Sequence, residues 1–424
     1  MIKRLKPKSE FSRNVLTLMT GTTIAQAIPI AISPILTRIY TPSDFGVLAL
    51  FVAISSIVAV IVTLRYERAM VQPNSDEDAA ALVVLSATIA TVISFLSLII
   101  VHVFNAQLQL WLGSPEVGPW LYLVPVSVFF TGLYQSLNYW HTRKKQFKSI
   151  AISKVNQGVG TASVQVGAGL GSIGSAGLIW GYILGQLISL ITLIKKSLTD
   201  DRKQFRSVKY QHLKLNAIHY QKMPKYSTWG ALADRLSLQM PVLVISKFYD
   251  MVQTGLFSLT FRVLSLPMSL VSSALSQVLF QKISKMHHES PYQIKAAILK
   301  LFFLLLAMMV PFIGFIWLFG EDVFALVFGE PWREAGAMAA ILVLAVAIRF
   351  AVSPLSAVLA LEHNIKLGVL WQFIYLFTIT ITLFYFSSFS IATLLYAFVV
   401  HEILLYLLYL LFILKGSTYI AVNK

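Results

Sequence analysis

Long runs of apolar residues, separated by short polar connections, fill most of the chain. A helix that crosses a bilayer needs about 20 mostly apolar residues, each adding about 1.5 Å. By this measure the pattern predicts about twelve membrane-spanning helices in an all-α integral membrane protein. They are expected near residues 14–37, 45–64, 79–104, 117–138, 151–170, 174–195, 226–246, 254–280, 296–319, 335–360, 366–386 and 390–414.

The composition agrees with a membrane protein. Of the 424 residues, 57% are hydrophobic and only 12% are charged, whereas soluble domains carry about 25% charged residues. A formal net charge of +16 would suggest nucleic acid for a soluble chain, but such binding needs basic residues gathered on one polar face. Here the cations lie between apolar runs. We therefore exclude nucleic acid as a partner and attribute the charge to membrane topology.

Lysine and arginine are concentrated in alternate connections. One set holds the stretch 195–225 and these cations: Lys3, Arg4, Lys6, Lys8, Arg13, Arg65, Arg68, Arg143, Lys144, Lys145, Lys148, Lys282, Lys285 and Lys295. The alternating set holds only Arg38, Lys247 and Arg333. Because cytoplasmic loops carry the excess of Lys and Arg, both termini are predicted to be cytoplasmic. The basic N-terminus lacks a small-residue cleavage pattern, so we interpret it as a cytoplasmic flank and not a signal peptide.

The longest polar connection divides the predicted spans into two halves of six. We expect an N-terminal six-helix bundle over 1–195, a basic linker over 196–225 and a C-terminal six-helix bundle over 226–424. Because each half has an even number of spans, a repeat would be parallel, with its axis along the membrane normal. Within the linker, 209–225 mixes apolar and basic residues and is expected as an amphipathic helix on the inner membrane surface.

A short alignment supports the repeat. TRIYTPSDFGVL at 37–48 aligns without gaps with SKFYDMVQTGLF at 246–257, pairing a cation, a tyrosine and a glycine. Both segments fall at the outer turn between the first two spans of their half. This shared position favours a structural hairpin, in which Pro42 and Gly46 supply the bend. Arg38 is then a residue of the outer rim.

Ionisable residues within the spans are the candidates for a site, because a buried charge costs at least about 2.5 kcal/mol and so lines a cavity or forms a pair. Asp234 and Arg235 lie near the middle of span seven. Arg262 lies roughly 12 Å below the outer end of span eight by helix rise, and Arg349 lies past the middle of span ten. The arginine fork suits phosphate oxygens. Either these arginines bind an anionic substrate, or they pair with Asp234, Glu402 or helix carbonyls and only fix packing.

Two further ionisable residues, His401 and Glu402, fall in the middle of span twelve among apolar neighbours. Such a carboxylate is a candidate for proton or ion coupling, as is Asp234. The alternative is a structural partner for an arginine. At the inner end of span two, Arg65 and Arg68 are one turn apart and form either a cytoplasmic anchor or a site for an anionic headgroup.

Span one is unusually polar for a membrane helix. It carries Asn14, Thr17, Thr20, Thr22, Thr23 and Gln26, and two prolines, Pro29 and Pro34. A helix that faces only lipid would not hold so many polar groups. One of its faces is therefore expected to line a wet interior, and the prolines allow it to bend.

The sequence gives no sign of catalysis. The outer connections are short, the longest being 105–116 and 320–334, which leaves no room for the outer catalytic domain that glycan-building membrane enzymes need. No phosphate-binding GxxxxGK[ST] loop occurs, and without cysteine there is no thiolate metal site. We predict a protein that is not an enzyme, with no cofactor and no metal.

Several segments resemble the polysaccharide transporter family of O-antigen and exopolysaccharide flippases, within the superfamily of multidrug extruders and lipid II flippases. They are TRIYTPSDFGVLALF, LRYERAMVQPNSDEDAAAL, TGLFSLTFRVLSLPMSLVSSALSQVLFQKISK and VFGEPWREAGAMAAIL. The resemblance implies two six-helix bundles in a V around a central cavity, in the bacterial inner membrane. It also implies translocation of an undecaprenyl-diphosphate-linked oligosaccharide to the outer leaflet, driven by an ion or proton gradient.

For the site, the resemblance implies cavity cations, which correspond to Arg235, Arg262 and Arg349, with Arg65 at the inner end and Arg38 meeting the diphosphate late in transport. The expected partners are the lipid-linked glycan, membrane lipids, a polysaccharide polymerase and a chain-length regulator. A drug or cation extruder of the same superfamily is the alternative. Its cavity should be dominated by carboxylates, so the arginines weigh against it.

Overall fold

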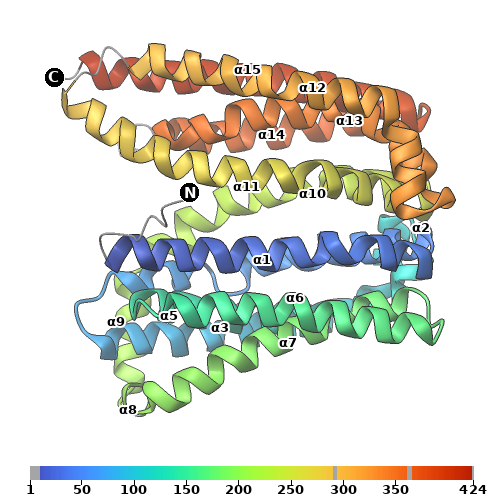
Figure 1. Ribbon diagram of the computed structural model, residues 1–424. Coiled ribbons are helices and arrows are strands. Elements are labelled where there is room, and N and C mark those ends of the chain that lie inside the picture. Colours follow the sequence, from blue (N-terminus) through green and yellow to red (C-terminus); the bar gives the residue numbers. More distant parts are fainter. Residues whose placement is uncertain (1–9, 290–293, 361–364, 423–424) are drawn as a thin grey trace, which may run out of the picture. The chain divides into compact units, whose positions relative to one another are not determined.

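The computed structural model describes residues 10–289, 294–360 and 365–422, which form helices and no strands (Figure 1). The first helices are α1 (Glu10–Ile39), α2 (Pro42–Ile61), α3 (Asp76–Leu112), α4 (Gly118–Leu121), α5 (Val124–Arg143), α6 (Phe147–Leu170), α7 (Ser175–Asp200), α8 (Arg202–Arg206) and α9 (Tyr210–His219). They are followed by α10 (Thr228–Phe248), α11 (Met251–Glu289), α12 (Ile294–Phe328), α13 (Arg333–Val352), α14 (Ile365–Phe386) and α15 (Ile391–Val422). Short 3₁₀-helices cover Tyr66–Val71, Pro115–Val117, Glu330–Trp332 and Ser353–Ala360, and Met223–Ser227 is a π-helix.

Twelve long helices in the described ranges overlap the twelve predicted spans. Eight are long and apolar enough to cross a membrane, and the pair Pro115–Leu121 and Val124–Arg143, bent by 50°, makes a ninth. The other three, α6, α10 and α11, are more polar because charged side chains such as Lys154, Asp234 and Arg262 lie within them. The prediction of an all-α, multi-pass membrane protein is confirmed.

The chain divides into two compact units, Met1–Arg235 and Leu236–Lys424, called unit 1 and unit 2 below. The division falls inside α10, after the linker and not within it. Unit 1 therefore contains α1 to α9 and the start of α10. Unit 2 contains the rest of α10 and α11 to α15.

The linker lies with unit 1 because specific hydrogen bonds bind it there. The Tyr66 hydroxyl donates to the Ala217 carbonyl of α9 at 2.9 Å, and the Asn216 amide donates to Asp78 at the start of α3 at 3.2 Å. The amphipathic helix expected over 209–225 is shorter than the prediction, since α9 ends at His219 and a π-helix follows. Its exposed face carries Tyr210, Leu215 and Ile218.

The two units repeat the same design around their third predicted span. Both α3 and α12 are mostly open to the surroundings, with only 22% of the most apolar window of each helix buried. Each ends at a glycine of positive φ, Gly113 at 70° and Gly329 at 102°. A proline-containing 3₁₀-helix follows in both cases. A side chain is strained at such φ values, so glycine is required where the chain turns back.

The turns between the first two spans of each unit, which the sequence predicts to be outer, also repeat. Thr41 caps α2, with its hydroxyl accepting from the Asp44 amide at 3.2 Å while the Asp44 carboxylate accepts from the Thr41 amide at 2.9 Å. In unit 2 the carboxylate of Asp250 accepts from the Gln253 amide at 2.7 Å, in front of α11. Both are N-caps that satisfy otherwise unpaired helix amides. Most of the stretch 37–48 therefore forms a structural hairpin.

A tyrosine ties each of these turns to the C-terminal end of the fifth predicted span of its own unit. The Tyr40 hydroxyl donates to the Gln165 carbonyl near the end of α6 at 2.6 Å. The Tyr249 hydroxyl donates to the Phe389 carbonyl just after α14 at 2.8 Å. The tyrosines that the alignment pairs thus make equivalent bonds, which explains why both turns contain one.

Replacing Tyr40 with phenylalanine is expected to lower the free energy of unfolding by about 1 kcal/mol, because the buried hydroxyl bond is lost and its acceptor is left with one fewer partner. The measurement is chemical denaturation in detergent. Tyr249→Phe is the matched control, since its bond lies at an exposed position and should cost less. Equal losses in the two variants would contradict this account.

Candidate functional site

A buried ionic cluster lies within unit 2, where α13, α14 and α15 each contribute one side chain. The Arg349 guanidinium of α13 donates through Nε to Glu402 Oε2 of α15, and through Nη2 to the Tyr375 hydroxyl of α14 at 2.6 Å. The Tyr375 hydroxyl in turn donates to Glu402 Oε1. The Glu402 side chain is 0% exposed and that of Arg349 is 15% exposed. The three groups form a closed ring in which both carboxylate oxygens accept a hydrogen bond.

Aromatic rings surround the guanidinium. Its Cζ lies 5.2 Å from the ring centre of Phe261, 5.7 Å from Tyr406 and 5.9 Å from Phe398. A cation over aromatic faces is stabilised by the ring quadrupole, and more strongly when water is excluded. The rings therefore hold Arg349 in place next to Glu402 and shield the pair from solvent.

His401 adds a titratable group beside the ring. Its Nε2 lies 3.0 Å from the Thr378 hydroxyl of α14, and its Nδ1 lies 3.7 Å from Glu402 Oε1. The Nδ1 atom is buried and has no hydrogen-bond partner within the described structure. A carboxylate, an imidazole and a phenol thus lie together in a closed interior, where a proton has several neighbouring acceptors.

Of the two readings offered for Arg349 by the sequence, the structure displays the pairing with Glu402. It does not leave this guanidinium open to an outside anion. The sequence did not point to Tyr375, Thr378 or Phe261. These neutral residues lie on other helices. The only sequence feature that could have indicated their contact with Arg349 is their similar depth within neighbouring spans.

Arg262 differs from Arg349 although both lie in unit 2. It is exposed on α11 and forms no hydrogen bond or ion pair with the residues that the structure describes. An arginine that no carboxylate neutralises keeps its full fork of donors available. Arg262 therefore has the properties of a cation that binds an external anion.

In unit 1, the two adjacent predicted site residues of α10, Asp234 and Arg235, have different surroundings. Arg235 is half-buried and lies within electrostatic range of Tyr182 on α7, whereas Asp234 is exposed. Within the described ranges Arg235 forms no hydrogen bond or ion pair. The two neighbours therefore do not neutralise one another by direct pairing, as expected from their adjacent helical positions.

Arg65 lies in a strained turn that follows the C-terminal end of α2. Leu64 and Arg65 have positive φ values of 48° and 63°, a conformation that costs about 1–3 kcal/mol for a side-chain-bearing residue. A buried hydrogen bond of 2.5 Å from the Thr63 hydroxyl to Glu67 holds the turn. Strain of this kind is concentrated at functional sites, so the side chain of Arg65 is a candidate for function.

That side chain is itself incompletely satisfied. The Nε atom of Arg65 is buried and has no partner among the described residues. Burial, followed by the charge of Arg68, lowers the pKa of Arg65, although a guanidinium remains protonated at physiological pH. Asp234 lies within electrostatic range. The structure thus brings two predicted site residues, Arg65 and Asp234, into one electrostatic neighbourhood of unit 1.

The remaining predicted residue, Arg38, lies exposed at the end of α1, where it donates to the Pro34 carbonyl at 2.7 Å. Other basic residues serve the fold. Asp76 binds both Arg143 at 3.0 Å and Lys144, which connects α3 to α5. No group of His, Asp and Glu side chains suited to a metal ion occurs in the part of the chain that is described.

A family profile described as polysaccharide biosynthesis protein matches residues 35–337, which is most of the chain. The chain belongs to this family. The resemblance found in the sequence is thereby confirmed, and the family match includes the outer turn, Arg65, Arg235 and Arg262.

One relative of this chain is named as a transport protein. The succinoglycan biosynthesis transport protein ExoT of Rhizobium meliloti (strain 1021) is 25% identical over 307 residues, which cover 71% of this chain. The match spans 59% of the length of that relative. Its whole activity therefore does not carry over directly.

Solved structures establish the fold of this family member. An inward-facing multidrug resistance transporter of the MATE family is similar with a TM-score of 0.72 at 12% identity, covering 96% of this chain and 94% of that one. The lipid II flippase MurJ in an inward closed conformation gives a TM-score of 0.69 at 15% identity, covering 97% and 90%. At such identities the likeness concerns the fold alone, and the substrate must be argued from this chain's own residues.

Proposed function

We propose that this protein is a flippase, not an enzyme, which moves an undecaprenyl-diphosphate-linked oligosaccharide from the cytoplasmic to the outer leaflet of the bacterial inner membrane. The glycan is an O-antigen or exopolysaccharide repeat unit. Transport occurs by alternating access, with both termini in the cytoplasm. A polysaccharide polymerase and a chain-length regulator are the proposed downstream partners.

The observation that carries this proposal is Arg262, an exposed arginine on a predicted span that no described carboxylate neutralises. A guanidinium at membrane depth is costly unless it has a partner in the transport cycle. Phosphate oxygens are the acceptors that best match its fork geometry. Arg65, with its strained backbone and orphaned Nε, is the proposed contact for the diphosphate near the cytoplasmic side, and Arg235 is a further contact.

We further propose that Glu402 and His401 couple transport to a proton or ion gradient. The support is that the ring of Arg349, Glu402 and Tyr375 spans three helices of unit 2. Protonation of Glu402 would remove the charge that holds Arg349 and would loosen all three helices together. A proton could thus change the conformation of unit 2 without touching the substrate.

The test is a flipping assay with the purified protein in liposomes. A fluorescent oligosaccharide linked to undecaprenyl diphosphate is placed in one leaflet, and its appearance in the other is followed with a membrane-impermeant quencher. We expect flipping above the rate of protein-free liposomes, and slower flipping of the same glycan on a monophosphate. Flipping that ignores the number of phosphates would contradict the proposed arginine contacts.

The second candidate is a drug or cation extruder, a class that includes a multidrug transporter of the same fold. Its test is efflux of a lipophilic cation from the same liposomes under a proton gradient. Cation efflux without glycan flipping would reverse our ranking. The unpaired arginines weigh against this outcome because like charges repel.

A further inference from the structure

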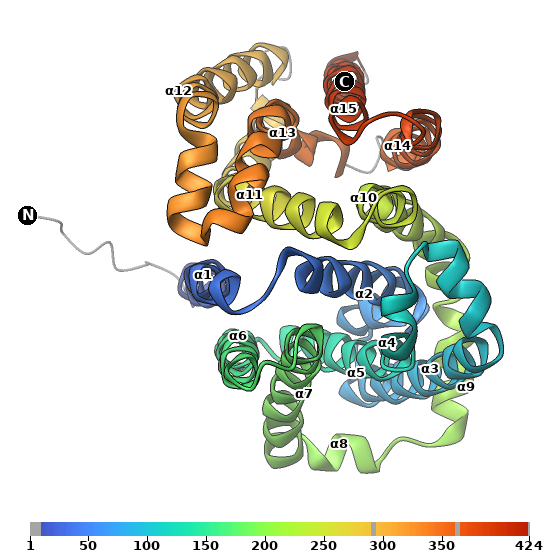
Figure 2. The same ribbon diagram turned by 90° about the vertical axis from the view of Figure 1, so that its right-hand side faces the viewer.

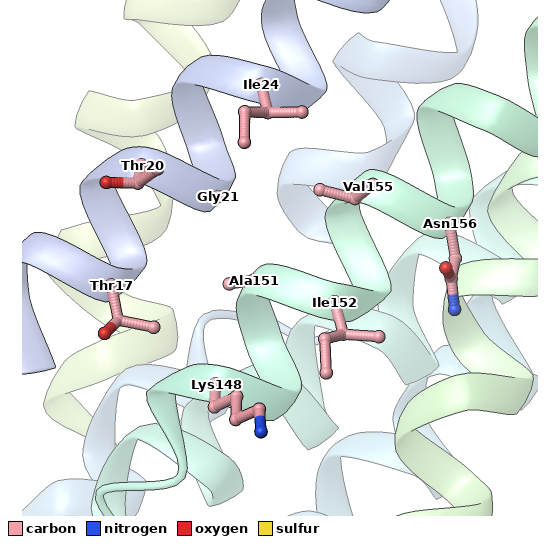
Figure 3. A pocket seen from close by; sticks show the side chains of 9 residues that line it. All are labelled: Thr17, Thr20, Gly21, Ile24, Lys148, Ala151, Ile152, Val155 and Asn156. Atoms are coloured by element: carbon pink, nitrogen blue, oxygen red, sulfur yellow. The ribbon is translucent and has the colours of Figure 1, made fainter.

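A groove of about 510 Å³ lies between α1 and α6 in unit 1 (Figure 3). Both helices lie at one edge of this unit, with α3 and α9 at the opposite edge (Figure 2). The groove is lined by Thr17, Thr20, Gly21, Ile24, Lys148, Ala151, Ile152, Val155 and Asn156. Its residues come from the first halves of both helices, on the side that the topology predicts to be cytoplasmic.

Small residues let the two helices approach closely at the groove. Gly21 of α1 lies against Ala151 of α6 so closely that no side chain would fit at position 21. This contact forms the floor, while the larger Ile24 and Ile152 stand at the sides and are exposed at 47% and 44%. An open, mostly apolar channel between two predicted spans provides a surface for a lipid chain, because hydrocarbon is the solvent within a bilayer.

The polarity of the groove changes along its length. Lys148 lies at the start of α6 and is exposed, whereas Ile24 and Val155 lie further along their helices. The amide of Asn156 is turned to α7, where it donates to the Thr192 hydroxyl at 3.2 Å. The groove thus has a cationic end and an apolar end, which is the polarity of an anionic lipid in the cytoplasmic leaflet.

We infer that this groove holds the polyprenyl chain of the diphosphate-linked lipid, with Lys148 beside its first phosphates. The inference rests on the proposed function and names a subsite for it, separate from the arginines. Thr20, which is exposed, then provides a hydroxyl where head and chain meet. The polar face of the first span was expected to line a wet interior. In this inference it contacts the lipid in the groove.

Charge favours the diphosphate lipid over an ordinary phospholipid. Lys145 is exposed three residues before Lys148, at the turn that begins α6. Neither lysine forms an ion pair or hydrogen bond with described residues, whereas Lys144 is paired with Asp76. Two unpaired cations match two ionised phosphates better than the single phosphate of phosphatidylglycerol. The occupant is therefore the lipid that carries the diphosphate.

Photo-crosslinking tests this assignment, and the absence of cysteine from the chain makes labelling selective. Ile152→Cys carries a thiol-linked benzophenone in liposomes that contain tritiated undecaprenyl diphosphate. Phe95→Cys, on the exposed side of α3, is the control for random lipid contact. We expect labelling at position 152 to exceed that at 95 by about tenfold and to fall by about tenfold when Lys148→Glu is added, as for the loss of one charged contact.

Competition identifies the occupant. Excess unlabelled undecaprenyl diphosphate should suppress labelling at 152, while equal phosphatidylglycerol should not. Equal suppression by both lipids, or equal labelling at 152 and 95, would overturn the inference. Specific labelling without glycan flipping would refute the proposed function and leave the groove as a lipid site. Flipping without specific labelling would support the proposed function and overturn the assignment of the groove.

Discussion

Replacing Glu402 with glutamine should lower the free energy of unfolding by about 3 kcal/mol, the largest effect on stability that we expect from a single substitution. Glutamine keeps the size of the side chain but removes its charge. Arg349 would then remain among Phe261, Phe398 and Tyr406 without a counter-charge. A buried charge that has lost its partner accounts for most of the cost of breaking such a pair. The measurement is chemical denaturation in detergent.

A matched control is available on the same helix as Arg349. Glu334 of α13 is exposed and accepts from Gln253 at 3.1 Å, so Glu334→Gln should change stability by no more than about 0.5 kcal/mol. Combining Arg349→Met with Glu402→Gln should recover about 2 kcal/mol relative to the sum of the single changes, since the two residues interact directly. Simple additivity would show that the ion pair does not stabilise unit 2.

The same variants address the proposed coupling. If Glu402 takes up the driving proton, Glu402→Gln should still bind the lipid-linked glycan but should flip it at a rate that no longer depends on the proton gradient. A purely structural role would lower the amount of folded protein and leave the gradient dependence of the remaining activity unchanged. The ratio of the flipping rates with and without the proton gradient therefore distinguishes the two roles, whereas the total activity does not.

Arg262→Ala should reduce glycan flipping by about 100-fold, as for the loss of hydrogen bonds worth about 3 kcal/mol to a charged group. Its stability should be near that of the wild type, because Arg262 is exposed and bonds to none of the described residues. Arg262→Lys should retain part of the activity, since it keeps the charge but loses the fork. The measurement is the liposome flipping rate at equal amounts of folded protein.

Arg333→Ala serves as the control for removing an arginine from unit 2. Arg333 is bound to Glu330 at 2.6 Å and to Asp322 at 2.7 Å at the turn between α12 and α13, so its charge is already neutralised. We expect its flipping rate to stay within about twofold of the wild type. If Arg262→Ala flips as well as Arg333→Ala, Arg262 does not contact the substrate and the proposal loses its main support.

The sequence predicted the helices better than the site. Apolar runs of about 20 residues mark spans because a bilayer imposes the same length on each, and the twelve expected segments all coincide with helices. The repeat was visible in Tyr40 and Tyr249, whose equivalent bonds then appeared in the structure. A basic linker was expected over 196–225, but its contacts were not. Tyr66 and Asn216 bind it to unit 1 through bonds that no local pattern reveals.

By itself, the sequence determined that this is an all-α membrane protein with few ionisable groups in its spans and arginines among them, and it predicted two similar halves. These properties follow from local hydrophobicity and the cost of burying charge, which each segment expresses without its neighbours. Only the tertiary structure decided which arginine is neutralised and which is open. Arg349 meets Glu402 across 53 residues, and Arg262 meets no carboxylate among the described residues, because helix packing and not chain order sets the distance between charges.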